Sequence, residues 1–354
     1  MAVITLVVGT RPNYMKMWPI WKALTESKVA DGHKIRVVST GQHSESMRQH
    51  VPLPHDAVFE ARGVGEERLQ VMVDVLTADF ESSHTDIVVV AGDVDSTLAG
   101  AIAAVETGSI LIHYEAGLRS GDWRMPEERN RVLVGQMADY HFCTTLLAMG
   151  NCAGSGKAVV VGNSMLDTLQ ELLPRSVDSS LLGDLGLRPG KYALMTIHRP
   201  TLVDDNAKLK DFYDNLKAFA KRHPVVWPVH PRVPWCPDRY KGLYVVPAVT
   251  YVDFLALEAN AGVVITDSGG VQEEASYLGV PCIVHRTTTE RRECLAPHGS
   301  VFLAGTNPAV TFNMADSQFG GDFQPKWDDE RYADGRAGKR AAGFIYAIAR
   351  GEEL

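Results

Sequence analysis

Short, almost wholly apolar runs recur along the chain, and each ends in a polar or glycine-rich cluster that leads into a helix-forming segment. Val3–Val8 is the first of these runs, and Gly9-Thr10-Arg11-Pro12 follows it. A strand that is apolar on both faces fits best in a parallel sheet that helices cover on both sides. The pattern therefore predicts an α/β protein. The other predicted strands are 34–39, 87–91, 110–113, 140–143, 158–161, 192–197, 225–228, 243–246, 262–265 and 282–284.

This alternation occurs in two stretches, which predicts two Rossmann-like domains. A chain of 354 residues also exceeds the length of one average domain. We expect the first domain at 1–168 and the second at 169–336, with the polar segment 174–190, punctuated by Pro and Gly, as a linker. The two domains are expected to face each other across a cleft, each presenting the carboxyl ends of its strands. Segment 312–327 shows no regular pattern, whereas 337–349 is predicted to be a helix that packs against another part of the chain.

The composition argues against several classes of function. The net charge of −8, from 35 basic and 43 acidic side chains, argues against a broad nucleic-acid-binding surface. The five cysteines include no Cys-x-x-Cys pair, which predicts reduced thiols in a cytoplasmic protein and neither a zinc site nor a disulfide framework. No apolar run approaches the length that spans a membrane, and residues 2–8 are expected to form a strand and not a signal peptide.

Segment 266–281 has the features of a nucleotide-binding turn. Gly269 and Gly270 lie between a predicted strand and a predicted helix, with Asp267 or Ser268 available as the helix cap. The N-terminus of such a helix suits a phosphate, and Glu274 lies where a carboxylate can accept hydrogen bonds from ribose hydroxyls. The same residues also fit an ordinary strand–turn–helix with a solvated acidic face, so the segment alone leaves the choice open.

Polar side chains also follow the other predicted strands. Arg11 and Lys16 are expected near the edge where open α/β sheets bind ligands, or simply on the surface. Asp93, Glu115 and Glu127 occur just after strands or at a helix start, although Asp93 alone could serve only as a helix cap. Together these groups predict a ligand site with acid–base capacity. The same strand edges are expected to carry His43, His198, His230, Ser268, Glu274 and Arg291.

Taken in order, these segments resemble the non-hydrolysing UDP-N-acetylglucosamine 2-epimerases, a family with the two-domain glycosyltransferase-B (GT-B) fold. Each fragment is short, but the ordered set is highly specific and covers most of the chain. The matching segments are Gly9-Thr10-Arg11-Pro12 with Lys16, Gly41-Gln42-His43, Gly92-Asp93 with Ser96-Thr97-Leu98, 115–120, 126–128 with Asn130-Arg131, His198-Arg199-Pro200, Pro228-Val229-His230, 267–270 with 272–274, and 288–291.

The resemblance implies roles for individual residues. It implies that the second half binds UDP, with Ser268 and Gly269 at the phosphates and Glu274 at the ribose. It also implies that residues 337–354 pack back on the first domain and that the protein is a homodimer. The positions with implied catalytic roles are Asp93, Glu115, Glu127 and His198. The other implied substrate or UDP contacts are Arg11, Lys16, Arg199, His230, Gly270 and Arg291. Gln42, His43, Arg68, Gln70 and His230 resemble, less closely, positions at which some relatives bind a second, activating UDP-GlcNAc.

The family's reaction explains why these residue types occur together. Carbon 2 of the sugar has no neighbouring carbonyl, so its proton is too weakly acidic for simple removal and return. The family eliminates UDP to give a glycal and adds UDP back with a proton on the other face, without a cofactor or a metal. This path needs a carboxylate base, an acid, and cations beside the departing diphosphate. The expected activity is therefore the interconversion of UDP-GlcNAc and UDP-ManNAc.

Three alternatives stay open from the sequence: a hydrolysing epimerase that releases ManNAc and UDP, a GT-B sugar transferase, and a non-enzymatic UDP-sugar sensor. Arg11-Pro12, Pro126-Glu127 and His198-Arg199-Pro200 favour the non-hydrolysing branch. The chain departs from the family pattern at Arg292, where many relatives have proline, and across 294–300. The resemblance therefore implies no substrate contacts for these residues.

Overall fold

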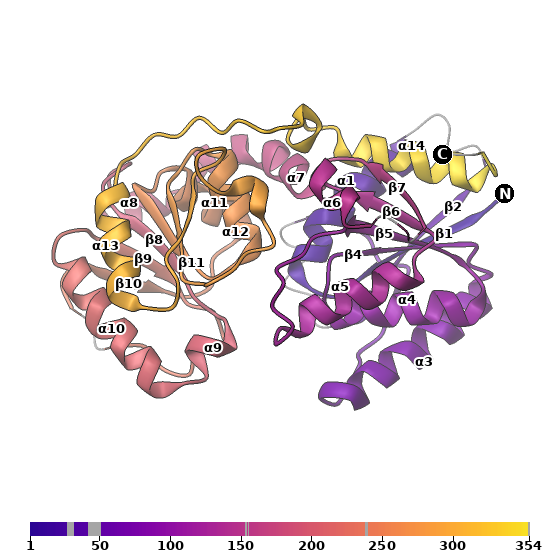
Figure 1. Cartoon of the computed structure of the whole chain (residues 1–354), viewed down its shortest axis with the longest axis horizontal. Helices are drawn as coiled ribbons and strands as arrows, with labels where there is room; N and C mark the ends of the chain where they lie inside the picture. Colours follow the sequence, from indigo (N-terminus) through magenta and orange to yellow (C-terminus); the bar gives the residue numbers. More distant parts are fainter. Residues whose placement is uncertain (27–31, 42–50, 153, 155, 238–239, 353–354) are drawn as a thin grey trace. The chain divides into compact units, whose positions relative to one another are not determined.

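The chain folds into two compact units, each built on one parallel sheet (Figure 1). The computed structural model describes residues 1–26, 32–41, 51–152, 154, 156–237 and 240–352. Unit 1 is Met1–Thr168 together with Asp329–Leu354, and unit 2 is Leu169–Asp328. The prediction of an α/β protein with two Rossmann-like halves is confirmed. Among the described helices, none has the length and apolar character needed to cross a membrane.

Among the described residues of unit 1, the sheet has seven strands in the order β3-β2-β1-β4-β5-β6-β7, and each pair is parallel. The chain builds outward from β1 on one side and then returns to add β4 on the other. Ligands of open α/β sheets bind outside the carboxyl ends of the strands at such a reversal. The strands are β1 (Val3–Val8), β2 (Lys34–Ser39), β3 (Ala57–Val58), β4 (Ile87–Ala91), β5 (Ile110–Ala116), β6 (Tyr140–Cys143) and β7 (Lys157–Val160).

Helices cover both faces of this sheet (Figure 1). On one face, α3 and α4 pack together over a core that includes Leu76, Phe80, Val88 and Val90. On the other face, α14 packs on α1. The helices of unit 1 are α1 (Arg11–Glu26), α3 (Gly65–Ser83), α4 (Asp95–Thr107), α5 (Pro126–Met137), α6 (Leu146–Gly150), α7 (Ser164–Leu172), the 3-10 turn η3 (Glu330–Tyr332) and α14 (Ala337–Ala349), with α7 continuing into unit 2.

In the described part of unit 2, the sheet has six strands in the order β10-β9-β8-β11-β12-β13, again with parallel pairs. The strands are β8 (Ala193–Thr196), β9 (Val225–Pro228), β10 (Leu243–Val246), β11 (Val263–Thr266), β12 (Cys282–Val284) and β13 (Val301–Leu303). The helices and turns are η1 (Leu173–Asp178), α8 (Leu181–Asp184), α9 (Pro200–Val203), α10 (Asn206–Ala220), α11 (Tyr251–Ala259), α12 (Gly269–Tyr277), η2 (Arg292–Cys294) and α13 (Pro308–Gln318).

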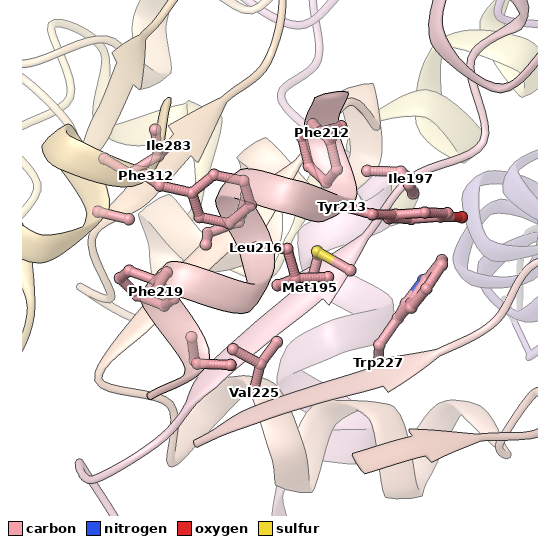
Figure 2. Packing of buried hydrophobic residues seen from close by; sticks show 14 of the residues in the cluster. Met195, Ile197, Phe212, Tyr213, Leu216, Phe219, Val225, Trp227, Ile283 and Phe312 are labelled. Atoms are coloured by element: carbon pink, nitrogen blue, oxygen red, sulfur yellow. The ribbon is translucent and has the colours of Figure 1, made fainter. Parts of the chain in front are cut away.

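Aromatic side chains fill the core of unit 2 under α10 (Figure 2). The ring centroid of Phe212 lies 5.0 Å from that of Phe312 on α13. The Tyr213 ring lies 5.6 Å from Trp227 on β9. Apolar side chains at three- and four-residue spacing along α10 produce this packing, because such spacing gives a helix one apolar face. The face fixes α10 against β8 and β9.

Two sequence predictions were wrong in unit 2. Segment 312–327 was expected to be irregular, but α13 (Pro308–Gln318) includes 312–318, and only 319–327 has neither helix nor strand. Asn307 caps this helix by accepting the N–H of Ala309 at 2.9 Å, and Phe312 is buried in the core. Segment 174–190 was expected to be a linker, but α8 and most of η1 lie in it. Its residues Leu181, Leu182, Leu185 and Leu187 pack against the core of unit 2.

Helix α14 begins on a buried carboxylate. Asp167 of α7 accepts the N–H of Gly338 at 2.8 Å and also that of Ala337. A carboxylate at a helix N-terminus is favourable because it meets unpaired N–H groups and the positive end of the dipole. Burial nevertheless raises the pKa of Asp167 to about 6, because these hydrogen bonds only partly offset the loss of water.

We expect Asp167 to make unit 1 less stable as the pH rises. Its folded pKa of about 6 lies above the ordinary value of 3.8, so the folded state binds the proton more tightly than the unfolded state. The stabilising contribution is therefore fully present below pH 3.8 and is lost as the pH rises through about 6. The difference between the folded and the ordinary pKa corresponds to about 3 kcal/mol in the free energy of unfolding. Urea unfolding from pH 4 to pH 8 should show wild type losing stability relative to Asp167→Asn, and parallel curves would contradict the assignment.

Candidate active site

Glu115 lies at an irregularity near the end of β5. The pairing of β5 with β6 shifts register between Tyr114 and Ala116, and Glu115 itself has a φ of 64°. Positive φ is unfavourable for a residue with a side chain, and such strain concentrates at functional sites. The Glu115 carboxylate is buried and forms an ion pair with the buried ammonium of Lys16 from α1. The bulge therefore places a carboxylate with its cation at the carboxyl edge of the unit 1 sheet.

Gly92, just after β4, lets this ion pair approach the backbone. Its φ is 72°, and a Cβ atom there would lie 3.0 Å from Lys16 Nζ and 3.1 Å from Glu115 Oε2. The carbonyl of Gly92 lies 2.9 Å from His113 Nε2. Burial lowers the pKa of His113 to about 4, so the ring is uncharged at neutral pH and donates Nε2–H to that carbonyl. His113 thus fixes Gly92 without adding charge.

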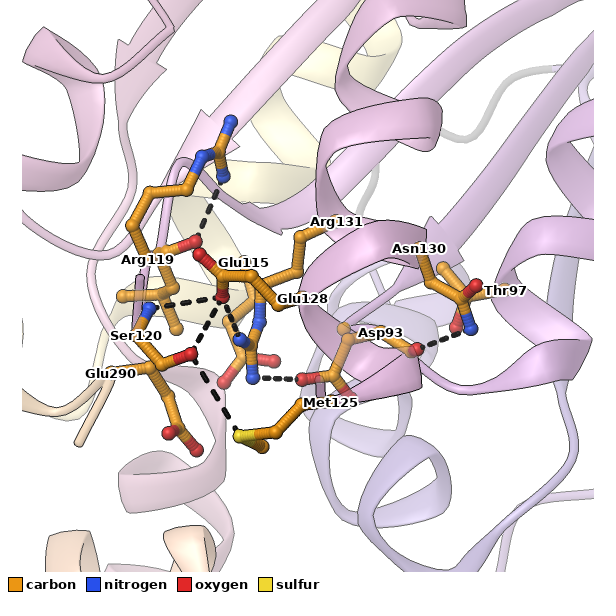
Figure 3. Close-up of polar contacts among 12 residues, drawn as sticks. Asp93, Thr97, Glu115, Arg119, Ser120, Met125, Glu128, Asn130, Arg131 and Glu290 are labelled. Atoms are coloured by element: carbon orange, nitrogen blue, oxygen red, sulfur yellow. Dashed lines mark hydrogen bonds and ion pairs between the residues drawn. The ribbon is translucent and has the colours of Figure 1, made fainter. Parts of the chain in front are cut away.

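A second charged network joins the loop after β4 to α5 (Figure 3). Arg131 lies between two carboxylates, pairing with Asp93 through one nitrogen and with Glu128 through the other. Glu128 also accepts the N–H and the hydroxyl of Ser120 at 2.9 Å and the N–H of Gly121 at 3.0 Å. Burial opposes its ionisation, but these donors and Arg131 hold the pKa of Glu128 below its usual value. Arg131 thereby orients Asp93 and anchors the 120–121 loop.

The network contains a glutamate that the sequence did not single out. Glu127, expected to be catalytic, is half-buried in the first turn of α5, whereas Glu128 is buried. Glu128 and Arg131 are three residues apart, so they share one side of the helix. That spacing was the available signal for Glu128. Its contacts make it a positioning residue for Asp93 and for the loop.

The remaining candidates of unit 1 lie on α1 and α3. Arg11 is the first residue of α1 and is half-buried. Arg68 forms an ion pair with Asp95 at 2.7 Å, and Gln70 donates to Asp74 at 2.8 Å on the same helix. Gln42 and His43 lie outside the described residues.

In unit 2, Asp267 organises the loop after β8. Its carboxylate accepts the backbone N–H of His198 at 2.9 Å and that of Arg199 at 2.8 Å, and lies 3.0 Å from His198 Nδ1. Asp267 is fully buried, which opposes ionisation, yet His198 and these N–H groups keep its pKa below the ordinary value. The carboxylate fixes the His198 ring with Nδ1 protonated, which leaves Nε2 for other contacts. The His230 ring lies 5.2 Å from that of His198.

The start of α12 carries the predicted nucleotide groups. Ser268 occupies the N-cap position, but among the described residues its side chain makes no capping hydrogen bond. Glu274 is buried and accepts the hydroxyl of Tyr251 at 2.7 Å. Arg291 lies 3.2 Å from the carboxylate of Glu273. This helix N-terminus, with a guanidinium nearby, has the chemistry of an anion-binding site.

Each unit thus offers one kind of chemistry. Unit 1 presents buried carboxylates paired with cations, which suit proton transfer. Unit 2 presents a histidine held by a carboxylate and a helix N-terminus that suits phosphate. Across the described residues, no three or more histidine, cysteine or carboxylate side chains are grouped to hold a metal ion.

Comparison with known proteins points to one family. A family model described as UDP-N-acetylglucosamine 2-epimerase matches residues 26–346. The UDP-N-acetylglucosamine 2-epimerase of Methanocaldococcus jannaschii is 32% identical over 367 residues, covering 97% of this chain and 98% of the relative. The UDP-2,3-diacetamido-2,3-dideoxy-D-glucuronate 2-epimerase of Pseudomonas aeruginosa is 34% identical over 364 residues, covering 97% and 99%.

Solved structures agree with this similarity. The Methanocaldococcus jannaschii UDP-GlcNAc 2-epimerase, in complex with UDP-GlcNAc and UDP, matches with a TM-score of 0.86 at 29% identity, covering 97% of this chain and 99% of that one. A glycosyltransferase from Rickettsia africae, with a TM-score of 0.56 at 12% identity and 99% coverage of both chains, shares the fold alone. The predicted GT-B fold class is thereby confirmed.

Proposed function

Because the chain belongs to the UDP-N-acetylglucosamine 2-epimerase family, as its motifs predicted, we propose that it interconverts UDP-GlcNAc and UDP-ManNAc by eliminating and re-adding UDP. The observation that carries this proposal is the buried Glu115–Lys16 pair at the strained end of β5. Elimination across carbons 1 and 2 needs a carboxylate that is held in place as a base. The contact with Lys16 holds the Glu115 carboxylate at the carboxyl edge of the sheet.

The proposed roles follow from the chemistry of each group. Glu115, Asp93 and Glu127 supply the base and the acid that move the carbon 2 proton off one face and onto the other. Arg11, Lys16 and His198 stabilise the charge that develops on the departing diphosphate. In unit 2, the proposed UDP contacts are Arg199, His230, Ser268, Gly269, Gly270, Glu274 and Arg291.

The proposal predicts incorporation of solvent hydrogen at carbon 2. Purified protein incubated with UDP-GlcNAc in deuterated water should give UDP-ManNAc that carries deuterium at carbon 2, because the returning proton comes from an exchanged acid. Proton NMR of the same sample reports the substrate, the product and the label. Epimerised product without deuterium would contradict elimination and re-addition.

The same spectrum separates the alternatives. Free ManNAc and UDP accumulating in proportion to enzyme would instead establish the hydrolysing reaction. Sugar transfer to an added acceptor would establish a transferase. A sensor would bind UDP-GlcNAc and leave it unchanged, with or without an acceptor, and that result would exclude epimerisation of UDP-GlcNAc by either route.

A second substrate is favoured by one similarity. The Pseudomonas aeruginosa relative, 34% identical to this chain, is named for a diacetamido glucuronate. Supplying UDP-GlcNAc and the UDP-diacetamido uronate in parallel reactions, with kcat/KM measured for each, decides between the two substrates.

We also propose that the protein is a cytoplasmic homodimer. Arg68 and Gln70 are further proposed to belong to a site for a second, activating UDP-GlcNAc.

A further inference from the structure

A carboxylate from a neighbouring loop lies against the first residue of α12. Glu290 belongs to the segment between β12 and η2, and a Cβ atom on Gly269 would lie 2.7 Å from Glu290 Oε1. The glycine therefore lets the Glu290 carboxylate approach the helix N-terminus. A negative charge there is favourable because it faces the positive end of the helix dipole. Glu290 thus places a negative charge beside the helix end where an anionic ligand would bind.

Other contacts hold this loop against α12. Arg286 Nη2 lies 2.7 Å from Glu290 Oε2, and the two side chains are only 9% and 3% exposed. Thr289 donates its hydroxyl to Gln272 Oε1 at 2.6 Å, and Gln272 donates to the Ser268 carbonyl at 2.8 Å. The loop is therefore tied to the first turns of α12. Glu290 is therefore a buried, ordered side chain of this loop and not a mobile side chain at the protein surface.

The proposed function places the UDP diphosphate at this same helix N-terminus. Two anions cannot occupy one place, and even side by side they repel strongly in a site with little water. We propose that Glu290 is a charge-discriminating residue of the diphosphate site, which weakens the binding of a diphosphate more strongly the more negative charge that diphosphate carries. This inference rests on the proposed function for the location of UDP.

The charge on Glu290 should disfavour free UDP more than UDP-GlcNAc, and this difference suits the reaction. The terminal phosphate of free UDP is nearly doubly charged at neutral pH, since its second pKa is about 6. The same phosphate in UDP-GlcNAc is an ester and carries a single charge. Glu290 therefore disfavours bound UDP relative to bound UDP-sugar. During turnover this favours the return of UDP to the glycal over accumulation of the UDP complex.

Calorimetric titration of the full chain with UDP, UDP-GlcNAc and uridine tests this inference. Glu290→Gln keeps the size of the side chain and an oxygen that can accept from Arg286, but removes the charge. The variant should bind UDP about tenfold more tightly than wild type. UDP-GlcNAc should gain less, and uridine should not change. Glu293→Gln is the matched control, since it makes the same change of charge in the adjoining turn η2, and the atoms nearest a Cβ on Gly269 belong to Glu290 and Arg291.

Glu290→Asp provides a second variant that keeps the charge but withdraws it from Gly269. Glu290→Gln should bind UDP most tightly, Glu290→Asp less tightly, and wild type least tightly. If Glu290 served only to hold Arg286 and the loop, both variants would bind UDP more weakly than wild type, and that outcome would overturn the inference while leaving the proposed function intact. Equal gains for UDP and UDP-GlcNAc would also overturn it. Wild-type protein that binds neither nucleotide would overturn the proposed function and this inference with it.

Discussion

Replacing Glu115 by glutamine should lower kcat by about a thousandfold while leaving UDP bound with near wild-type affinity. Glutamine keeps the shape of the side chain but cannot accept a proton from carbon 2. The buried contact with Lys16 is retained only as a hydrogen bond from the ammonium to the amide oxygen, because the ion pair loses its negative partner. Turnover is measured by NMR of UDP-GlcNAc conversion, and UDP affinity by calorimetry.

Glu81→Gln is the control for this experiment, because Glu81 is an exposed residue of α3. It makes the same chemical change far from any predicted site residue in the sequence, so turnover should remain within twofold of wild type, that is about 0.4 kcal/mol. Unchanged turnover in Glu115→Gln would remove Glu115 from the mechanism. Loss of UDP binding together with turnover would instead assign Glu115 a structural role.

The strands of the sheets could be predicted closely from the sequence. β1 and β4 have the predicted bounds because both are apolar along their whole length, and a strand buried on both faces needs no long-range information to be recognised. β13 has only three residues, Val301–Leu303, and was missed. A run that short is stabilised by its pairing with β12, which the local pattern does not contain.

The candidate site could be predicted only in part. Asp93 and Glu115 were expected at strand ends, because parallel strands deliver their following residues to one edge of the sheet. The positive φ of Glu115 was not predictable, since the bulge depends on how β5 pairs with β6. Glu127 was chosen on the family resemblance, and Glu128 was not singled out because its burial depends on how α5 packs. The approach of Glu290 to Gly269 involves a loop without periodic pattern.

Asp267→Asn should both destabilise unit 2 and impair turnover. The Asp267 carboxylate accepts from two backbone N–H groups and pairs with His198 Nδ1. Asparagine offers one accepting oxygen and an NH2 group, so at least one buried donor would face another donor. We expect the free energy of unfolding to fall by about 2–4 kcal/mol. We also expect kcat to fall by roughly a hundredfold, because the His198 ring loses the group that fixes its tautomer.

The pH dependence of this loss distinguishes the charge from the shape of the side chain. The pKa of Asp267 lies below the ordinary 3.8, so its stabilising contribution is present above that pH and is lost as the pH falls through the lower, folded value. The stability difference between wild type and Asp267→Asn, measured by urea unfolding, should therefore be full at pH 7 and shrink below pH 4. Asp205→Asn is the matched control, because Asp205 caps α10 at the surface and asparagine caps helices equally well. A stability difference that stays constant with pH would show that packing, and not the charge on Asp267, holds the His198 loop.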